Sequence, residues 1–215
     1  MNKKIDFKNI RINYKKLKID FNNLKDCPID LFLDWFHEAL STNKHEANAC
    51  VLSTVSIDNK PSSRVVLIKE VNKEGFIFFT NYRSDKSTDI HCNPNVSLNF
   101  YWPELERQVR ICGVANKIPN SDSDDYFNSR PRESQLGALL SDQSLSVSMD
   151  HDFMKVLDTL KIKFEGKEVK RPLHWGGYCV LPRKIEFWQG RPSRLHHRLM
   201  YVFDGKRWHK ERLAP

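Results

Sequence analysis

The sequence predicts a mainly β protein with inserted helices, built on an antiparallel sheet or barrel. Three observations lead to this fold class. Short stretches rich in Val, Ile, Thr and aromatic residues recur along the chain and are joined by turn-forming residues. These stretches follow one another as hairpins instead of alternating with helices. The chain also lacks a G-x-G-x-x-G or phosphate-loop motif, which disfavours a dinucleotide-binding α/β fold.

The first half of the chain is predicted to form one helix and then strands. Pro28 suits the first turn of a helix, and an apolar stripe with helical spacing follows it. That stripe consists of Phe32, Trp35, Phe36, Ala39 and Leu40. A short polar helix is expected over residues 84–91, ending before Asn93-Pro94. Strands are expected at 49–56, 63–70, 76–80, 96–102 and 107–118.

The second half begins with helical signals and returns to strands. Ser121-Asp122 can cap a helix that runs to Arg130, and Pro131 can start the next one. The spacing of Phe153, Val156, Leu157 and Leu160 predicts a third helix. Further strands are expected at 178–181, 184–188, 198–203 and 207–212.

Composition excludes several classes of protein. No run approaches the roughly 18 apolar residues that span a bilayer, and no apolar segment of a secretory signal follows the N-terminus. The five cysteines are scattered without C-x-x-C spacing, which predicts reduced thiols in a cytosolic protein and no zinc site or disulfide framework. The dispersed histidines likewise show no metal-ligand spacing.

The basic charge of the chain is concentrated at its N-terminus. The net charge is +8, and residues 1–18 hold seven Lys or Arg side chains against Asp6 alone. We therefore expect a flexible basic arm over 1–25 and a single domain over 26–215, without a basic surface for nucleic acid on that domain.

Three clusters could carry chemistry, and each has a plainer interpretation. Arg64 and Lys69 flank an apolar strand and should point to opposite faces; alone they could be solvated charges on an edge strand. Tyr126, Arg130 and Ser134 recur every four residues, around Pro131, and could bind a phosphate or merely cap a helix break.

The third cluster is the strongest of the three. Glu186-Phe187-Trp188-Gln189-Gly190 precedes a stretch with Arg194, His196 and Arg198, which share one face if that stretch is extended. Two guanidinium groups beside an imidazole suit an anionic aromatic ligand. A solvated basic strand is the plainer alternative. Gln108 could offer an amide to a flavin or could be an ordinary strand residue.

Nine sequence pieces together resemble the pyridoxamine/pyridoxine 5'-phosphate oxidase family over nearly the whole chain. They occur in the order R-V-V-L-I-K (64–69), F-T-N (79–81), L-E-R-Q-V-R (105–110), Y-F-N-S-R-P-R-E-S-Q-L-G-A (126–138), D-Q-S (142–144), W-G-G-Y (175–178), E-F-W-Q-G (186–190), R-L-H-H-R (194–198) and R-L-A-P (212–215). The resemblance implies an antiparallel split β-barrel of the FMN-binding type. It further implies a homodimer with FMN at the subunit interface. The composition adds the expectation of a cytoplasmic protein without nucleic-acid or membrane partners.

The resemblance also implies roles for individual residues. FMN would contact Arg64, Val65, Val66, Leu67, Ile68, Lys69, Phe79, Thr80, Lys86, Gln108, Gln143, Ser144, Trp188 and Arg198. The substrate phosphate would bind Lys69, Tyr126, Arg130 and Ser134. Arg194 and His196 would be catalytic residues around the substrate ring, and Arg11 and Tyr14 would belong to a segment that closes over the substrate.

The implied reaction is the oxidation of pyridoxamine or pyridoxine 5'-phosphate by O2 to pyridoxal 5'-phosphate. Hydrogen peroxide is released, and ammonia as well from the amine. The isoalloxazine ring of FMN supplies the redox chemistry. A related flavin oxidase of the phenazine-biosynthesis type, a non-catalytic flavin- or pyridoxal-phosphate-binding split barrel, and a nucleic-acid binder are the alternatives.

Two positions depart from the family pattern. His197 stands where Asp is usual in R-L-H-D-R, and Asp85 stands where a cation is usual in S-R-K. Both changes are expected to weaken the binding of FMN. Arg83, two positions before Asp85, could compensate for the lost cation.

Overall fold

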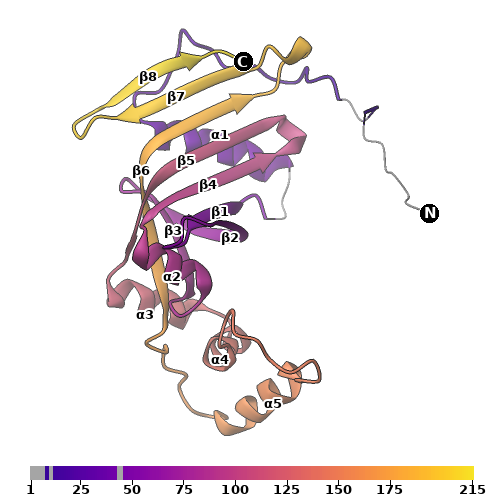
Figure 1. Ribbon diagram of the computed structural model, residues 1–215, viewed down its shortest axis with the longest axis vertical. Coiled ribbons are helices and arrows are strands. Elements are labelled where there is room, and N and C mark those ends of the chain that lie inside the picture. The colour runs from indigo at the N-terminus through magenta and orange to yellow at the C-terminus, as the bar shows by residue number, and fades with distance from the viewer. Residues whose placement is uncertain (1–7, 10–11, 43–45) are drawn as a thin grey trace. The chain divides into compact units, whose positions relative to one another are not determined.

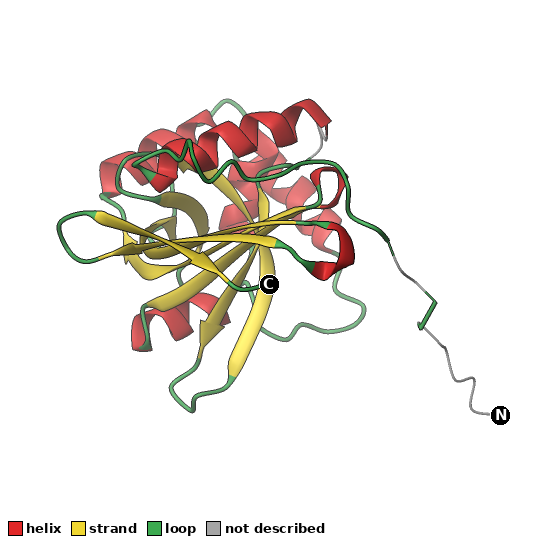
Figure 2. Cartoon of the chain, turned by 90° about the horizontal axis from the view of Figure 1, so that it is seen from above, coloured by secondary structure: helices red, strands yellow, loops and turns green. Residues whose placement is uncertain are grey.

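The structure is a computed structural model that describes residues 8–9, 12–42 and 46–215 (Figure 1). Within these residues there are eight strands, five α-helices and two short 3-10 turns, coloured by type in Figure 2. The chain forms two compact units. Unit 1 comprises Met1–Ala47, Phe100–Arg110 and Lys184–Pro215, and unit 2 comprises Asn48–Asn99 and Ile111–Arg183.

The described strands form an antiparallel split barrel, as predicted. β1 (Ala49–Val55) pairs with β2 (Pro61–Val71) and with β4 (Asn95–Trp102), and β2 pairs with β3 (Phe76–Asn81). The hydrogen-bonded order continues through β5 (Arg107–Lys117) and β6 (Trp175–Gln189). Because β3 also pairs with β6, these six strands close into a ring that leaves none of them with a free edge.

Strand β6 corrects the sequence prediction of two strands at 178–181 and 184–188. It runs without interruption from Trp175 to Gln189, through Pro182. Its pairing with β3 runs from Trp175 to Val180, and its pairing with β7 (His197–Phe203) starts at Lys184. Pro182 therefore lies where the strand changes partners, and there its missing N–H breaks neither ladder.

A glycine allows β3 and β6 to meet at the end of their ladder. A Cβ atom on Gly75 would lie 2.0 Å from the carbonyl oxygen of Val180. The turn before Phe76 can therefore hold only glycine without moving the backbone of β6.

Four helices belong to unit 2, and all four were predicted. They are α2 (Asp85–Cys92), α3 (Asn120–Ser129), α4 (Arg132–Leu140) and α5 (Phe153–Lys163). Helices α3 and α4 contribute Phe127, Leu136 and Ala138 to a buried cluster with Val169 and Trp175. This cluster fixes the helices beside the start of β6.

Unit 1 combines the predicted helix α1 (Pro28–Thr42) with the hairpin of β7 and β8 (Trp208–Leu213). Phe32, Trp35 and Ala39 of the predicted stripe are buried, whereas Leu40 is 40% exposed. Trp35 packs edge-on against Phe187 of β6, at 5.2 Å between ring centroids. The helix is therefore anchored through its apolar face, as its sequence pattern predicts.

Residues 12–25 follow the surface of unit 1 without regular structure. The N–H of Lys16 donates to the Glu106 carboxylate at 3.0 Å, and the carbonyl of Lys25 accepts from the Tyr201 hydroxyl at 2.7 Å. Ile19 is buried. Strands β4, β5 and β6 have residues in both units, so no linker separates the units, and the single domain predicted over 26–215 stays a prediction.

No helix in the described part of the chain is long and apolar enough to cross a membrane. All five cysteines are free thiols. The described residues contain no cluster of His, Cys, Asp and Glu that could hold a metal ion.

Candidate active site

Unit 2 contains a cavity of ≈ 450 Å³, here called the barrel pocket, which gathers most of the predicted phosphate-binding residues. Its lining consists of Val65, Val66, Leu67, Lys69, Phe79, Thr80, Asn81, Lys86, Tyr126, Arg130, Ser134, Gly137, Ala138, Ser141, Gln143 and Trp175. Lys69, Lys86 and Arg130 give it three cations, and no carboxylate is among these lining residues. The pocket therefore suits an anionic ligand.

The break between α3 and α4 brings Tyr126, Arg130 and Ser134 to the same pocket. Helix α3 ends at Ser129, Arg130 is extended with φ −73° and ψ 148°, and α4 starts after Pro131. Pro131 divides two helices, as predicted, because its ring is incompatible with a helix interior. The three side chains nevertheless all line the barrel pocket.

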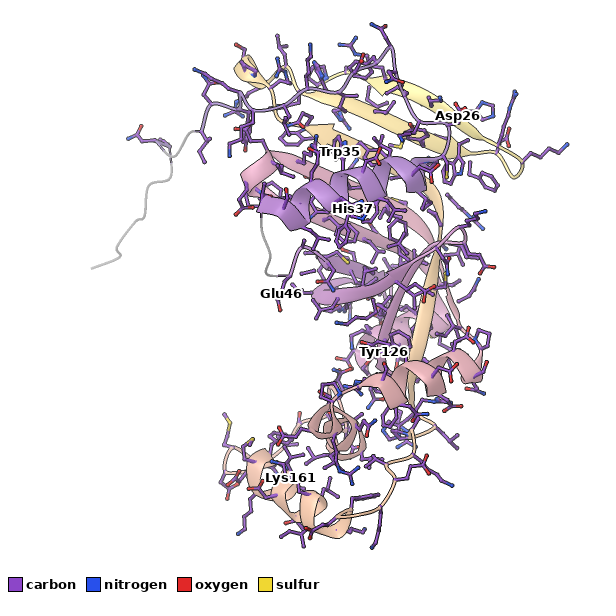
Figure 3. All side chains as sticks on the ribbon, turned by 180° about the vertical axis from the view of Figure 1, so that it is seen from behind. Asp26, Trp35, His37, Glu46, Tyr126 and Lys161 are labelled. Atoms are coloured by element: carbon purple, nitrogen blue, oxygen red, sulfur yellow. The ribbon has the colours of Figure 1, made fainter. Side chains whose placement is uncertain are left out.

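Tyr126 and Arg130 are held by aromatic contacts. The Tyr126 ring, labelled in Figure 3, stacks on Phe79 at 3.9 Å between centroids. The Arg130 guanidinium lies over the Trp175 ring at 4.5 Å. Such stacking fixes the side chains without using their polar atoms, which stay free for a ligand.

Arg130 has an unsatisfied buried atom. Its Nη1 is buried and has no hydrogen-bond partner. Burial lowers the pKa of Arg130, partly offset by Tyr126. A buried donor without an acceptor is costly in a folded protein, and a phosphate oxygen would satisfy it. This atom is therefore consistent with an oxyanion ligand in the barrel pocket.

Lys86 of α2 lies among uncharged acceptors. Its Nζ donates to Thr80 Oγ1 at 3.1 Å, to Ser84 Oγ at 2.9 Å and to Gln143 Oε1 at 2.9 Å. Burial, together with the nearby charge of Arg64, lowers the pKa of Lys86 to about 8. The ammonium group therefore lacks a counter-ion in the contacts it makes, as expected of a site for a phosphate.

Arg64 and Lys69 leave β2 in different directions. Lys69, at an irregularity of the β2–β3 register, lines the barrel pocket with Val65 and Leu67. Arg64 instead donates to Thr54 Oγ1 at 2.7 Å and is not part of that lining. Ile68 is buried, and its backbone carbonyl accepts from Asn48 Nδ2 at 2.8 Å. Arg64 and Lys69 thus have different surroundings, but strand alternation alone does not account for this, because Val66 also lines the pocket and the register shifts between Ile68 and Glu70.

Asp85, one of the two departures, is the first residue of α2. Its N–H donates to Ser144 Oγ at 3.2 Å, and Ser144 has a positive φ of 77°. The Asp85 carboxylate acts against the lowering of the pKa of both Arg64 and Lys86. It thus adds negative charge near two predicted FMN-binding cations. The Arg83 side chain is exposed, and its compensating role stays a prediction.

Unit 1 contains a second cavity of ≈ 510 Å³, here called the loop pocket. It is lined by Ile12, Asn13, Tyr14, Trp188, Arg191, Ser193, Arg194 and His196. The ring centroids of Trp188 and His196 lie 4.6 Å apart. The Tyr14 ring meets both rings edge-on, with centroid distances of 5.7 Å to Trp188 and 5.8 Å to His196. A Cβ on Gly190 would lie 2.7 Å from Tyr14 Cγ, so glycine is what lets this ring approach.

The stretch from Arg194 to Arg198 is not the extended segment that its pattern suggested. Pro192–Arg194 form the 3-10 turn η2, and β7 begins only at His197. Ser193 and Arg194 have positive φ values of 56° and 61°, a conformation that costs free energy in residues other than glycine. The turn brings Arg194 and His196 to the loop pocket but leaves Arg198 out of its lining.

His196 has a defined hydrogen-bonding state. Its Nδ1 accepts the N–H of Arg191 at 3.1 Å. Burial and the charge of Arg194 lower the pKa of His196, which favours the neutral ring. With Nδ1 an acceptor, the neutral ring carries its proton on Nε2 and can donate it to a ligand.

His197, the second departure, accepts a hydrogen bond much as a carboxylate would. Its Nδ1 accepts the N–H of Ile19 at 3.2 Å, and its ring packs on Phe21 at 5.2 Å. Burial, followed by the charges of Arg191 and Arg212, lowers the pKa of His197 and keeps the ring neutral. The replacement of Asp by His therefore keeps an acceptor for the backbone of residue 19.

Arg198 and Gln108 lie in unit 1 outside the loop pocket. Arg198 is bound by Glu186, which lies in the E-F-W-Q-G piece and for which the sequence predicted no role. Alternation along β6 places Glu186 and Trp188 on one face and could have indicated it. Asn81 was also missed; its Nδ2 donates to the Ser141 carbonyl at 2.9 Å and holds the segment before Gln143. Arg11 lies outside the described residues.

The chain matches two family profiles. Residues 36–160 match the one described as pyridoxamine 5'-phosphate oxidase. Residues 175–215 match the one described as the pyridoxine 5'-phosphate oxidase C-terminal dimerisation region. Together these matches cover the residues of both pockets except those of the N-terminal segment.

Curated relatives are similar over nearly the full length. A pyridoxine/pyridoxamine 5'-phosphate oxidase 2 from Hydrogenovibrio crunogenus is 47% identical over 98% of this chain and 99% of its own length. A pyridoxine/pyridoxamine 5'-phosphate oxidase from Haemophilus ducreyi is 48% identical over 98% of this chain and 100% of its own length.

Solved structures share the fold. PhzG from Burkholderia lata, in complex with tetrahydrophenazine-1-carboxylic acid, superposes with a TM-score of 0.87 at 28% identity, covering 94% of this chain and all of that one. A pyridoxamine 5'-phosphate oxidase-related, FMN binding protein from Nostoc punctiforme superposes with a TM-score of 0.72 at 15% identity, covering 89% of this chain and all of that one. At this identity the similarity shows a shared fold and nothing about function.

Proposed function

The chain belongs to the pyridoxamine 5'-phosphate oxidase family, and from this premise we propose that it oxidises pyridoxamine or pyridoxine 5'-phosphate to pyridoxal 5'-phosphate, with FMN as cofactor and O2 as electron acceptor. Hydrogen peroxide is the second product, and the amine substrate also releases ammonia. The proposal includes a cytoplasmic homodimer with FMN at the subunit interface, supported by the family's dimerisation region in residues 175–215.

The observation that carries the proposal is the barrel pocket with its unsatisfied Arg130. Both proposed ligands, FMN and the B6 vitamer, carry a phosphate. The lining of the pocket includes two groups of polar side chains. Lys86, Gln143 and Thr80 form the first group, and Lys69, Tyr126, Arg130 and Ser134 form the second. A guanidinium, an ammonium and two hydroxyls are suited to bind the oxygens of a phosphate monoester.

The loop pocket supplies the groups for the substrate ring. Arg194 brings a positive charge, and His196 brings an Nε2–H donor fixed by the N–H of Arg191. Both can hold the substituted pyridine ring of the substrate in one orientation through its polar substituents. Tyr14 and Trp188 add apolar walls that exclude water.

The division of work between protein and cofactor follows from these residues. When bound, FMN would supply the redox chemistry, as acceptor of the hydride equivalent from the substrate C4' carbon and donor of electrons to O2. The chain's own residues bind the phosphate, orient the ring and exclude water. Their main contribution to the rate is the positioning of the substrate at reactive distance.

Phenazine-type chemistry is the second candidate, because PhzG has the same fold with a TM-score of 0.87. Two observations favour the B6 phosphates. Identity to the curated B6 oxidases is 47–48%, against 28% to PhzG. A phosphate-binding set around Arg130 would also have no use with a ligand that lacks a phosphate.

The decisive experiment is aerobic turnover of pyridoxine 5'-phosphate by the purified protein with added FMN. We expect pyridoxal 5'-phosphate and hydrogen peroxide in equal amounts and in many-fold excess over enzyme. A folded protein that binds FMN but forms no product would leave the non-catalytic binding protein and the phenazine-type enzyme as the alternatives. Dihydrophenazine carboxylic acids, tested as substrates in parallel, would separate these two.

A further inference from the structure

Glu186 is a buried carboxylate between two arginines. It lies on β6 and is only 3% exposed. Its Oε1 accepts from Arg198 Nε at 2.7 Å, and its Oε2 is in contact with Arg110 Nη2. Burial alone would raise the pKa of Glu186, but the hydrogen bonds from Arg198 and Arg110 outweigh burial and lower it. The carboxylate is therefore ionised in the folded chain.

Arg198 lies in the middle of a three-strand ladder. Its backbone is opposite Trp188 of β6 on one side and opposite Leu213 of β8 on the other. Directly opposite residues project to the same face of a sheet, so the Arg198 and Trp188 side chains leave the sheet on one side. Glu186 is two residues before Trp188 and shares that side.

Two contacts fix the orientation of the Arg198 guanidinium. Nε donates to Glu186, and Nη1 donates to the carbonyl of Ala214 at 2.9 Å. Two hydrogen bonds to different atoms prevent rotation of a planar group. In the described part of the chain Nη2 makes no hydrogen bond, so it is the end of the guanidinium that can serve a ligand.

We propose that Glu186 is a positioning residue for cofactor binding, which fixes Arg198 so that Nη2 is presented to the flavin. The inference rests on the proposed function, in which Arg198 and Trp188 contact FMN. A mobile arginine loses side-chain entropy when it binds a ligand, whereas an arginine held in place beforehand does not. Glu186 therefore strengthens FMN binding without touching FMN.

Charge gives Glu186 a second effect on the same site. Arg110 and Arg198 together carry two positive charges, and Glu186 neutralises one of them. Without the carboxylate, the two guanidinium groups would repel each other on one face of the sheet. Arg198 would then move away from Arg110 and lose the orientation set by Ala214.

The test is a titration of the FMN-free protein with FMN, followed by the quenching of flavin fluorescence. We expect Glu186→Ala to raise the Kd about 10-fold, the effect of losing one charge-assisted hydrogen bond. Glu186→Gln keeps an acceptor for Nε and should stay within about 3-fold of the unaltered chain. Arg110→Gln is the matched control: it breaks the other ion pair of the same carboxylate and should leave the Kd nearly unchanged.

A double-mutant cycle with Arg198→Ala separates positioning from a general loss of structure. Positioning requires that Glu186→Ala has almost no further effect on the Kd once Arg198 is absent. An equal loss of affinity with and without Arg198 would overturn the proposal, as would a Glu186→Ala protein that binds FMN normally. If Glu186→Ala does not fold, as judged by circular dichroism, Glu186→Asp replaces it, because its shorter side chain withdraws from Nε.

The same titration distinguishes the two proposals. An unaltered chain that fails to bind FMN refutes the proposed function. An unaltered chain that binds FMN, combined with additive effects in the cycle, refutes only the role of Glu186.

Discussion

At the scale of single residues, the cations of the barrel pocket are surrounded by uncharged groups. Arg130 stacks on Trp175, and Lys86 donates to Thr80, Ser84 and Gln143. Neither has an ion pair with a carboxylate among the described residues. Charges without counter-ions lower the stability of the free chain, and the binding of an anionic ligand offsets this loss of stability.

Arg130→Gln should separate ligand binding from stability. The KM for pyridoxine 5'-phosphate should rise about 10- to 100-fold, because a charge-assisted hydrogen bond to the phosphate is lost. The free energy of unfolding should fall by no more than about 1 kcal/mol, because Nη1 has no partner to lose and the contacts that disappear are those with the Trp175 and Phe127 rings. Steady-state kinetics and urea unfolding measure the two effects.

Arg132→Gln is the matched control, two residues away. Arg132 donates to the carbonyls of Phe164 and Lys167 at 2.6 and 2.8 Å and is not part of the barrel pocket. It should lower stability by about 1–3 kcal/mol and leave the KM unchanged. The reverse pattern for the two variants would show that Arg130 has a structural role.

Lys86 should make FMN binding depend on pH. Its pKa is lowered to about 8, so the ammonium is charged below pH 8 and loses its proton above it. The Kd for FMN should therefore be flat below pH 7 and rise above pH 8, by at most about tenfold per pH unit. Fluorescence titrations between pH 6.5 and about 9.5 measure this. Lys86→Arg stays charged throughout and should remove the dependence; a wild-type Kd without a rise above pH 8 would contradict the assignment.

At the scale of elements, helix α2 places opposing charges at its first turn. The negative charge of Asp85 interacts favourably with the positive N-terminal end of the helix dipole and so stabilises α2, whereas Lys86 lines the barrel pocket. A cation at position 85 would favour a phosphate at the cost of the helix. Helix stability and FMN affinity are thus in conflict at this position.

Asp85→Arg should shift that balance. FMN should bind about 3- to 10-fold more tightly, because two units of charge change near Arg64 and Lys86. The free energy of unfolding should fall by about 0.5–1 kcal/mol through the helix dipole. Asp158→Arg on α5 makes the same change of charge on another helix and should not alter the FMN affinity. Equal affinities for Asp85→Arg and the unaltered chain would remove position 85 from the cofactor site.

At the scale of the whole molecule, the predicted site residues fall into two sets, one in each unit. The barrel pocket belongs to unit 2, and the loop pocket, Arg198 and Gln108 belong to unit 1. In the proposed dimer, we expect one active site to take the first set from one subunit and the second set from its partner. Each subunit would then serve both sites.

Mixing two impaired variants tests this arrangement. Arg130→Ala impairs the first set and Arg194→Ala the second, so each homodimer should have little activity at a substrate concentration near the KM of the unaltered enzyme. After the two are unfolded together and refolded, half the dimers are hybrids with one intact site, so activity should recover to about one quarter of the wild-type value. Mixtures that stay at the low activity of the homodimers, although hybrids are detected by mass spectrometry, would mean that both sets come from the same chain.

The sequence by itself determined most of the secondary structure and, through the family resemblance, part of the composition of the site. The apolar stripe from Phe32 to Ala39 and the hairpin spacing depend on local periodicity, which neighbouring residues set directly. Pro131 was predicted to divide α3 from α4 because its ring blocks a helix whatever the tertiary context. The nine ordered motifs named the family and, with it, part of the lining of both pockets, including Lys69, Arg130 and His196.

Only the tertiary structure decided how strands end and which groups meet. Pro182 does not interrupt β6, because it falls where the strand exchanges β3 for β7, a property of pairing that no local pattern contains. The turn at Ser193 and Arg194 replaces an extended segment, since its positive φ values depend on surrounding contacts. The partnership of Glu186, Arg198 and Ala214 joins residues far apart in the chain, and only folding brings them within hydrogen-bond distance.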